Sequence, residues 1–172
     1  MDDTVAVALF RHGLTEANKS HAYLGWTDSP LCQEHREKLA AAPQYYCRIF
    51  ASDLGRCMKT AAILFPDHSI ESCPEWREMH FGEWEGRTYQ ELKDNPAYQK
   101  WLENPFSGVV PGGESFSAFT ARVAEFNRSI ASEGYARCRS YYTWRSHKIP
   151  SWKVCTGEKR VLGMASSVWK RL

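Results

Sequence analysis

Arg11 and His12 stand directly after a short apolar run, Val5 to Phe10. A run that ends abruptly in polar residues is typical of a buried parallel strand, and open α/β sheets bind their ligands at the carboxyl ends of such strands. A neutral imidazole is a nucleophile, and a guanidinium holds an anion. By itself an Arg-His-Gly triplet is more often a strand end with a hydrogen-bonded histidine, so the assignment depends on companion residues.

Two further segments supply those companions. Arg56 follows a second apolar pair, Ile49 and Phe50, at another predicted junction of strand and helix. Glu78 lies in the aromatic segment 75–86, whose rings would exclude water from its carboxylate. Displacing the alcohol of a phosphate monoester needs charge neutralisation, a nucleophile and a proton for the leaving oxygen, and these residues offer a candidate for each need.

The three segments in this order resemble the histidine phosphatase superfamily, also called the phosphoglycerate mutase-like family. The later sequence Pro-Gly-Gly-Glu-Ser at 111–115, followed by Phe119 and Arg122, is similar to that family as well. The resemblance covers about residues 5 to 130. It implies a three-layer α/β/α sandwich with a mainly parallel central sheet. We expect a single domain over residues 1–172, family-like to about residue 137, with an atypical tail over residues 138–172.

The resemblance implies a role for each matching residue. His12 is the nucleophile that forms a phosphohistidine, which water then hydrolyses. Arg11 and Arg56 clamp the phosphoryl oxygens, and Asn18 adds a neutral donor. Glu78 protonates the leaving alcohol and then activates the water.

The role of Glu78 requires a carboxyl pKa well above the ordinary value, which burial near Phe81 or Trp84 and the charge of the phosphate would supply. Glu85 is the competing carboxylate, but its Glu-Gly context is typical of a structural residue.

The tail differs from the rest of the chain in charge. From residue 136 onward it carries nine Lys or Arg and one acidic residue, Glu158, whereas the whole chain has 22 and 20. The second catalytic histidine of the family stands in a Thr-His-Gly-Gly context, and nothing in the written tail matches it. His147 lies near in sequence, but its context differs.

A one-nucleotide frameshift near residues 137–140 accounts for this break. Codons for Tyr141 to Lys148, read one nucleotide later, can spell Ile-Thr-His-Gly-Gly-Val-Ile-Arg, with the histidine at the position of Thr143. The glycine at the position of Trp144 is forced by any arginine codon that follows. We therefore interpret residues 138–172 as frameshifted, which removes the basic character of the tail and with it the case for nucleic-acid binding.

The segment from Glu78 to Pro111 is compact, whereas mutase members of the family carry a longer insertion here, so hydrolysis is favoured over mutase phosphotransfer. Residues 81–89 together with 111–115 resemble the α-ribazole phosphatase branch, which serves cobalamin biosynthesis, although broad-specificity phosphatases share much of this pattern. Two alternatives stay open: a pseudoenzyme that binds a phosphate ligand without turnover, and mutase-type phosphotransfer.

Composition sets further limits. The chain has 172 residues, 43% of them hydrophobic, with no apolar run of membrane-spanning length and an acidic start, so we expect a cytoplasmic protein that does not bind membranes. Its six cysteines form no C-x-x-C pair and are predicted to be free thiols, mostly buried. We expect a small-molecule phosphate ester as partner, no nucleic acid, no cofactor and no metal. The oligomeric state is left open.

Strands are predicted at 4–10, 47–52 and 68–72, and no convincing strand pattern follows Arg137. Helices are predicted at 33–42, 55–64, 87–103 with an interruption at Pro96, and 114–131. The pair Ser52 and Asp53 is suited to capping the second of these helices. The aromatic residues Trp76, Trp84, Tyr89 and Trp101 are assigned to the core in preference to stacking on a substrate.

Overall fold

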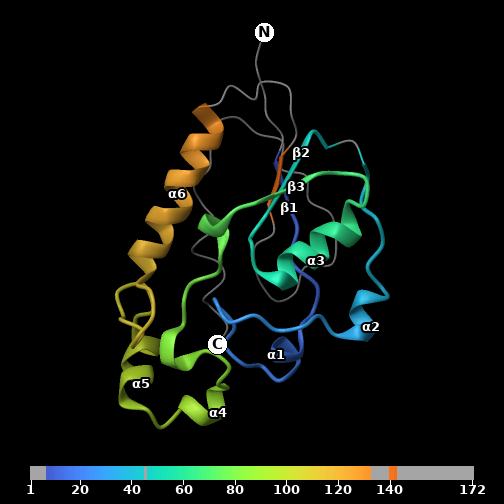
Figure 1. Ribbon diagram of the computed structural model, residues 1–172. Helices are drawn as coiled ribbons and strands as arrows, with labels where there is room; N and C mark the ends of the chain where they lie inside the picture. The colour runs from blue at the N-terminus through green and yellow to red at the C-terminus, as the bar shows by residue number, and fades with distance from the viewer. Residues whose placement is uncertain (1–6, 45, 133–139, 143–172) are drawn as a thin grey trace.

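The computed structural model describes residues 7–44, 46–132 and 140–142 (Figure 1). The sheet in this part of the chain has four strands, all paired in parallel, in the order β1-β4-β2-β3. The strands are β1 (Val7–Leu9), β2 (Arg48–Ala51), β3 (Ile70–Ser72) and β4 (Ser140–Tyr142). Parallel neighbours need crossover connections, and helices provide them here, so the fold is α/β as predicted.

β4 lies at the centre of the sheet, between β1 and β2. Leu9 pairs with Tyr142, and Ile49 pairs with Tyr141. The sequence after Arg137 has no convincing strand pattern, so this strand was not predicted. Strands on both sides supply backbone partners for β4, and this pairing cannot be read from three residues of local sequence.

The other strands fall within the predicted segments but are shorter. β1 covers the part of 4–10 from Val7 to Leu9, and residues 4–6 lie outside the described part of the chain. β2 and β3 likewise occupy the middle or end of their predicted segments.

Six α-helices and two 3-10 turns connect and cover the described strands. They are α1 (Glu16–Lys19), α2 (Gln33–Arg36), α3 (Gly55–Leu64), η1 (Pro74–Trp76), η2 (Gly82–Trp84), α4 (Tyr89–Leu92), α5 (Pro96–Glu103) and α6 (Phe116–Ser132). α3 has the predicted bounds, and α6 begins two residues later than predicted.

Two predicted helices differ from the structure. The segment 87–103 forms two helices, and the second begins at Pro96, where the side chain of Asn95 accepts hydrogen bonds from the backbone N–H groups of Ala97 (2.9 Å) and Tyr98 (3.2 Å). The segment 33–42 is helical only to Arg36. α2 buries no residue, so no packing stabilises further turns, and Pro43 disfavours helical backbone at the residue before it.

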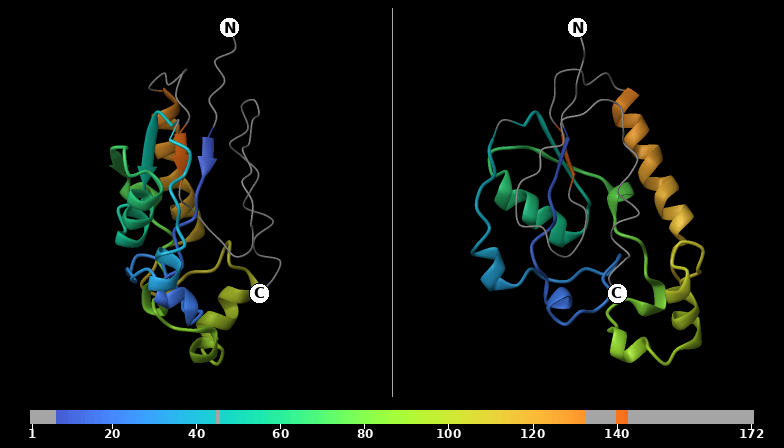
Figure 2. Two further views of the ribbon diagram at one scale, coloured as in Figure 1. Left: turned by 90° about the vertical axis from the view of Figure 1, so that its right-hand side faces the viewer. Right: turned by 180° about the vertical axis from the view of Figure 1, so that it is seen from behind.

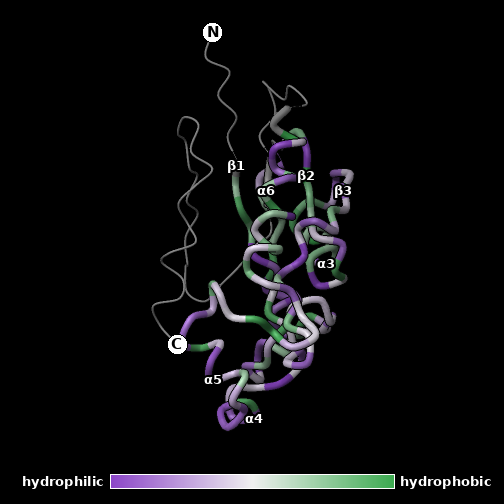
Figure 3. Tube along the Cα trace, turned by 90° about the vertical axis from the view of Figure 1, so that its left-hand side faces the viewer, coloured by the Kyte–Doolittle hydropathy of each residue, from purple (hydrophilic) through white to green (hydrophobic). Residues whose placement is uncertain are grey.

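The two faces of the sheet are covered by different helices, because neighbouring residues of a strand point to opposite faces. Ile49 packs with Leu64 and Phe65 at the end of α3. Phe50 belongs to the other face, where it packs with Trp76 and with Phe126 of α6. Figure 2 shows α3 and α6 on either side of the strands. In Figure 3 the strands β1 and β2 are drawn mainly in the green of hydrophobic residues.

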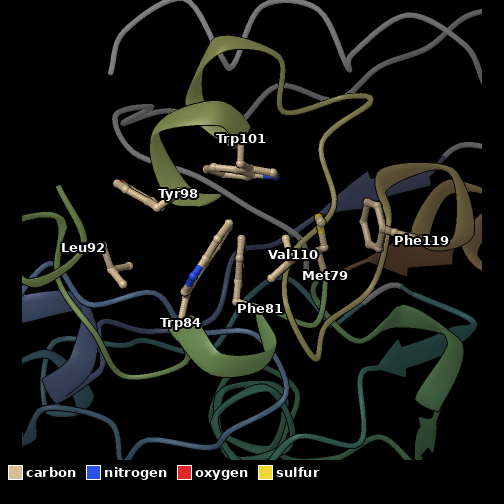
Figure 4. Packing of buried hydrophobic residues seen from close by; sticks show 8 residues of the cluster. All are labelled: Met79, Phe81, Trp84, Leu92, Tyr98, Trp101, Val110 and Phe119. Carbon is tan, nitrogen blue, oxygen red and sulfur yellow. The ribbon is translucent and has the colours of Figure 1, made fainter. Parts of the chain in front are cut away.

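A third cluster lies beyond the carboxyl ends of the strands and is mainly aromatic (Figure 4). Its buried members are Met79, Phe81, Trp84, Leu92, Tyr98, Trp101, Val110 and Phe119. Trp84 packs edge to face against Tyr98 and Trp101, with ring centroids 5.3 and 5.4 Å apart. Because Met79 and Phe81 belong to this cluster, it fixes the backbone on the C-terminal side of Glu78.

The core assignment of the aromatic residues is confirmed for Trp76, Trp84 and Trp101, which are all at most 5% exposed. It was wrong for Tyr89, which is 53% exposed. Tyr89 begins α4, a single turn that buries only Leu92.

Three of the four described cysteines, Cys32, Cys57 and Cys73, are buried free thiols, and Cys47 is an exposed free thiol. Cys138 and Cys155 lie outside the described residues. No helix within the described ranges has both the length and the apolar character that crossing a membrane requires.

Candidate active site

Arg11, His12 and Arg56 are brought together by the ends of two strands. β1 ends at Leu9, shortly before Arg11 and His12, and β2 ends at Ala51, shortly before the first turn of α3 that carries Arg56. Both strands are parallel to β4 between them, so their carboxyl ends lie at one edge of the sheet (Figure 1). The charges of Arg56 and Arg11 both act on His12, as expected for residues that share this edge.

The imidazole of His12 is oriented by the backbone. Its Nδ1 donates to the carbonyl oxygen of Gly13 at 2.7 Å, because a carbonyl oxygen only accepts, and this leaves Nε2 as the basic nitrogen of the neutral ring. Gly13 is itself fixed, since its N–H donates to Oγ1 of Thr60 at 3.0 Å.

The pKa of His12 is lowered from 6.5 to about 4, chiefly by burial and additionally by the positive charges of Arg56 and Arg11. The hydrogen bond to Gly13 and the charge of Asp28 act in the opposite direction. The ring is therefore neutral near pH 7, and a neutral imidazole is the nucleophilic form.

The guanidinium of Arg56 is buried and held by a loop that precedes it by about thirty residues. Its Nη2 donates to the carbonyl oxygen of Gly25 at 2.6 Å, and its Nη1 donates to that of Thr27 at 3.0 Å. The residue is only 2% exposed, and its Nε has no acceptor among the described residues. A buried guanidinium with an unused N–H is suited to hold an anion.

Asp28 caps α3, although the sequence pointed to Ser52 and Asp53. Oδ1 of Asp28 accepts from the backbone N–H of Arg56 at 3.2 Å and lies 3.5 Å from its Nη1. Asp53 instead forms a bidentate ion pair with Arg77, whose Nε donates to it at 2.7 Å. The capping prediction was wrong because the cap comes from a distant loop that local sequence does not place.

Glu78 follows η1 and is half-buried. Its Oε1 accepts from the N–H of Met79 at 3.0 Å, and its carbonyl oxygen accepts from Nε1 of Trp26 at 3.0 Å. Trp26 is 38% exposed and lies against the ring of His80, with centroids 4.8 Å apart. Trp26 was not predicted as a site residue, because it is an aromatic residue in a polar loop between predicted elements.

The segment that carries Glu78 is held from the other side by α6. Nη1 of Arg122 donates to the carbonyl oxygens of Glu75 (2.5 Å) and Arg77 (3.1 Å). The same guanidinium pairs with both carboxylate oxygens of Glu114, at 3.0 and 2.8 Å. Glu114 and Arg122, which contribute to the family resemblance, therefore anchor the segment that carries Glu78.

Glu85 uses both carboxylate oxygens to bind backbone. They accept from the N–H groups of Gly25 (3.0 Å), Trp26 (2.8 Å), Thr27 (3.1 Å) and Phe81 (3.0 Å). A carboxylate with four backbone donors is a structural element, in agreement with the sequence interpretation.

Asn18 is placed by α1. Its Oδ1 accepts from the N–H of Thr15 at 3.3 Å, and its N–H donates to Oγ1 of Thr15 at 3.2 Å, which together form a capping box. The amide nitrogen of its side chain has no partner among the described residues, so this donor is available to a ligand.

The position proposed for the second histidine, Thr143, and the nearby His147 lie outside the described residues. β4 ends at Tyr142, one residue before the first of them. In the described ranges, no group of three His, Cys, Asp or Glu side chains is arranged to hold a metal ion.

Comparison with known proteins places this arrangement in a family. Residues 7–140 match the model of the histidine phosphatase superfamily, branch 1. The adenosylcobalamin/alpha-ribazole phosphatase of Salmonella typhimurium is 34% identical over 173 residues, which cover 94% of this chain and 82% of that protein. Fructose-2,6-bisphosphatase TIGAR B of Danio rerio is 30% identical over 141 residues, which cover 74% of this chain and 53% of that protein.

Among solved structures, the alpha-ribazole phosphatase of Shigella flexneri superimposes with a TM-score of 0.71 at 27% identity, covering 81% of this chain and 72% of that one. The strand-end histidine, the two arginines and the matched sequence from residue 7 to residue 140 lead to one conclusion: this chain belongs to branch 1 of the histidine phosphatase superfamily.

Proposed function

We propose that this protein hydrolyses a small phosphomonoester through a phosphohistidine at His12. The observation that carries the proposal is a neutral imidazole with its Nδ1 bound to Gly13, its pKa lowered to about 4, and two arginine charges acting on it. This arrangement leaves Nε2 basic and surrounds it with the charges that a phosphate dianion needs.

In the first step, Nε2 of His12 attacks phosphorus, and the bond between phosphorus and the alcohol oxygen breaks. Glu78 donates its proton to that oxygen, so the product leaves as a neutral alcohol. Arg11 and Arg56 neutralise the phosphoryl oxygens, and the amide nitrogen of Asn18 donates a further hydrogen bond. Glu78 must carry a proton when the substrate binds, and the negative charge of the phosphate beside it favours the protonated form.

In the second step, water attacks the phosphohistidine, and the bond between phosphorus and Nε2 breaks. Glu78 accepts the proton from this water, which restores the protonated acid for the next cycle. Inorganic phosphate leaves, and His12 is again neutral. The cycle needs no cofactor.

We propose α-ribazole 5′-phosphate as the substrate. The name of the Salmonella typhimurium relative and the resemblance of residues 81–89 and 111–115 to that branch support this assignment. A comparison of kcat/KM for α-ribazole 5′-phosphate, fructose 2,6-bisphosphate and 3-phosphoglycerate tests it. The first should be highest, and conversion of 3-phosphoglycerate to its 2-phospho isomer would instead indicate mutase phosphotransfer.

The hydrolase assignment is tested with His12→Ala and the matched control His35→Ala, which changes an exposed histidine of α2. Hydrolysis of 4-nitrophenyl phosphate should be lost in the first variant and unchanged in the second. Activity that survives in His12→Ala would exclude His12 as the nucleophile.

A second candidate function is phosphate binding without turnover. It follows from residues 138–172 of this sequence, in which no residue matches the second histidine of the family. Sequencing of codons 130–172 in the expressed gene tests the frameshift that we infer. If the alternative frame spells Thr-His-Gly-Gly, the frame-restored protein should hydrolyse esters faster than the written chain by about 10²–10³, the cost of one missing donor to the phosphoryl group. If the alternative frame does not spell this motif, a pseudoenzyme that binds phosphate becomes the better assignment.

A further inference from the structure

The loop of residues 25–28 lies between two charged side chains, Glu85 and Arg56. On one side its three consecutive N–H groups, those of Gly25, Trp26 and Thr27, donate to the carboxylate of Glu85 at 3.0, 2.8 and 3.1 Å. On the other side the carbonyl oxygens of Gly25 and Thr27 accept from the guanidinium of Arg56 at 2.6 and 3.0 Å. The backbone of this loop therefore connects Glu85 to Arg56.

The same loop also contacts the segment that carries Glu78. Nε1 of Trp26 donates to the carbonyl oxygen of Glu78 at 3.0 Å. Glu85 also accepts from the N–H of Phe81 at 3.0 Å, three residues beyond Glu78. Glu85 thus binds both the loop that holds Arg56 and the segment that carries Glu78.

Gly25 allows the loop to lie close to the segment that carries Glu78. A Cβ at this position would lie 2.2 Å from the carbonyl oxygen of Met79 and 2.4 Å from Oε1 of Glu85. The backbone of the loop is therefore packed directly on the segment behind Glu78, with no side chain between them to absorb a displacement.

We propose that Glu85 is a positioning residue for catalysis. Through the loop of residues 25–28 it sets the guanidinium of Arg56 and the carboxylate of Glu78 relative to each other. Glu85 does not touch the substrate. The proposal rests on the proposed function, because it assigns to Arg56 the binding of phosphate. Affinity for phosphate should accordingly depend on Glu85, whose carboxylate lies on the opposite side of the loop from Arg56.

The test compares Glu85→Gln with Glu83→Gln. The control changes an exposed glutamate two residues away in η2. The amide introduced by Glu85→Gln would retain one acceptor oxygen and present an NH₂ group to some of the four N–H donors. Binding of inorganic phosphate is measured by titration calorimetry, which gives the dissociation constant and the fraction of binding-competent protein separately.

We expect the dissociation constant of phosphate to rise about tenfold in Glu85→Gln, since a displaced guanidinium loses aligned hydrogen bonds, with the competent fraction unchanged. Glu83→Gln should match the wild type within about twofold. An unchanged dissociation constant with only a lower competent fraction or a lower melting temperature would show that Glu85 merely stabilises the fold, and would overturn the proposal. Wild-type protein that binds no phosphate would instead overturn the proposed function.

Coupling to Arg56 is tested by repeating the change in an Arg56→Lys background. A lysine ammonium cannot bridge two carbonyl oxygens in the planar geometry of a guanidinium, so the path from Glu85 is interrupted there. Glu85→Gln should then alter the dissociation constant by less than about twofold. A full tenfold effect in this background would show that Glu85 acts independently of Arg56. Glu85→Asp, which keeps the charge but shortens the side chain, provides the same comparison if Glu85→Gln does not fold.

Discussion

Asp28 and Arg56 are joined twice: Oδ1 of Asp28 accepts from the backbone N–H of Arg56 at 3.2 Å and lies 3.5 Å from its guanidinium Nη1. The carboxylate of Asp28 thus caps the N-terminus of α3 and also helps to hold the guanidinium that we assign to phosphate binding. Because Asp28 lies on the loop that also accepts from Arg56 through Gly25 and Thr27, helix capping and site geometry depend on the same short loop.

Asp28→Ala should reduce stability and phosphate affinity together. Loss of a side-chain cap costs about 1 kcal/mol, and removal of the carboxylate that lies beside the buried guanidinium adds to that cost. Chemical unfolding and phosphate titration measure the two effects. Asp67→Ala, at an exposed aspartate beyond the end of α3, is the control and should leave both quantities unchanged.

The pKa of His12 predicts a pH dependence of stability. Between pH 6.5 and about pH 4 the unfolded chain binds a proton that folded His12 does not, because burial and two arginines keep the folded ring neutral. Above pH 6.5 His12 should therefore not lower the free energy of unfolding. Below pH 6.5 that free energy should fall as the pH decreases toward 4. His12→Gln should lose less stability over this range, and parallel curves for the two proteins would contradict the lowered pKa.

Glu78→Gln tests the proton donor through the leaving group. An alkyl phosphate needs protonation of its oxygen, so its hydrolysis should slow by about 10² or more, whereas 4-nitrophenyl phosphate should lose much less. Glu83→Gln serves again as the control. Equal losses for both esters would indicate that Glu78 acts in some way other than as an acid.

Gly82, which begins η2, and Gly86, which follows it, distinguish the cost of backbone strain from the cost of steric contact. Gly82 has φ +49°, and a Cβ there would lie 2.1 Å from the carbonyl oxygen of Pro111, whereas Gly86 has φ +75° with nothing within 4 Å of a Cβ. Gly86→Ala should cost about 1–2 kcal/mol of stability from left-handed backbone alone. Gly82→Ala should cost about 1–3 kcal/mol more, because the loop at Pro111 must move. Equal losses by thermal unfolding would contradict this close approach.

The sequence predicted those parts of the site that local pattern controls. The apolar runs before Arg11 and Arg56 identified two parallel strands and hence a shared sheet edge. The resemblance to the histidine phosphatases points to Glu78 as the proton donor, which stays a prediction. The Glu-Gly context sets it apart from Glu85, whose carboxylate binds backbone N–H groups. In each case the informative residues are neighbours in sequence.

Contacts over long separations escaped prediction. The cap of α3 comes from Asp28, the indole bound to Glu78 comes from Trp26, and β4 depends on pairing with β1 and β2. None of these follows from hydrophobic periodicity or capping preference, because each requires knowledge of which loop or strand lies alongside. Tyr89 was misplaced for a similar reason: the turn it begins buries Leu92 and leaves the ring exposed.

The most direct test of the account is to trap the phosphorylated protein. The protein is mixed with a phosphomonoester labelled at phosphorus and quenched in alkali, which preserves phosphohistidine, and the labelled peptide is then identified by mass spectrometry. We predict that the label is on His12 and is absent from His12→Ala. A label on another residue, or hydrolysis without any phosphorylated protein, would contradict nucleophilic catalysis by His12.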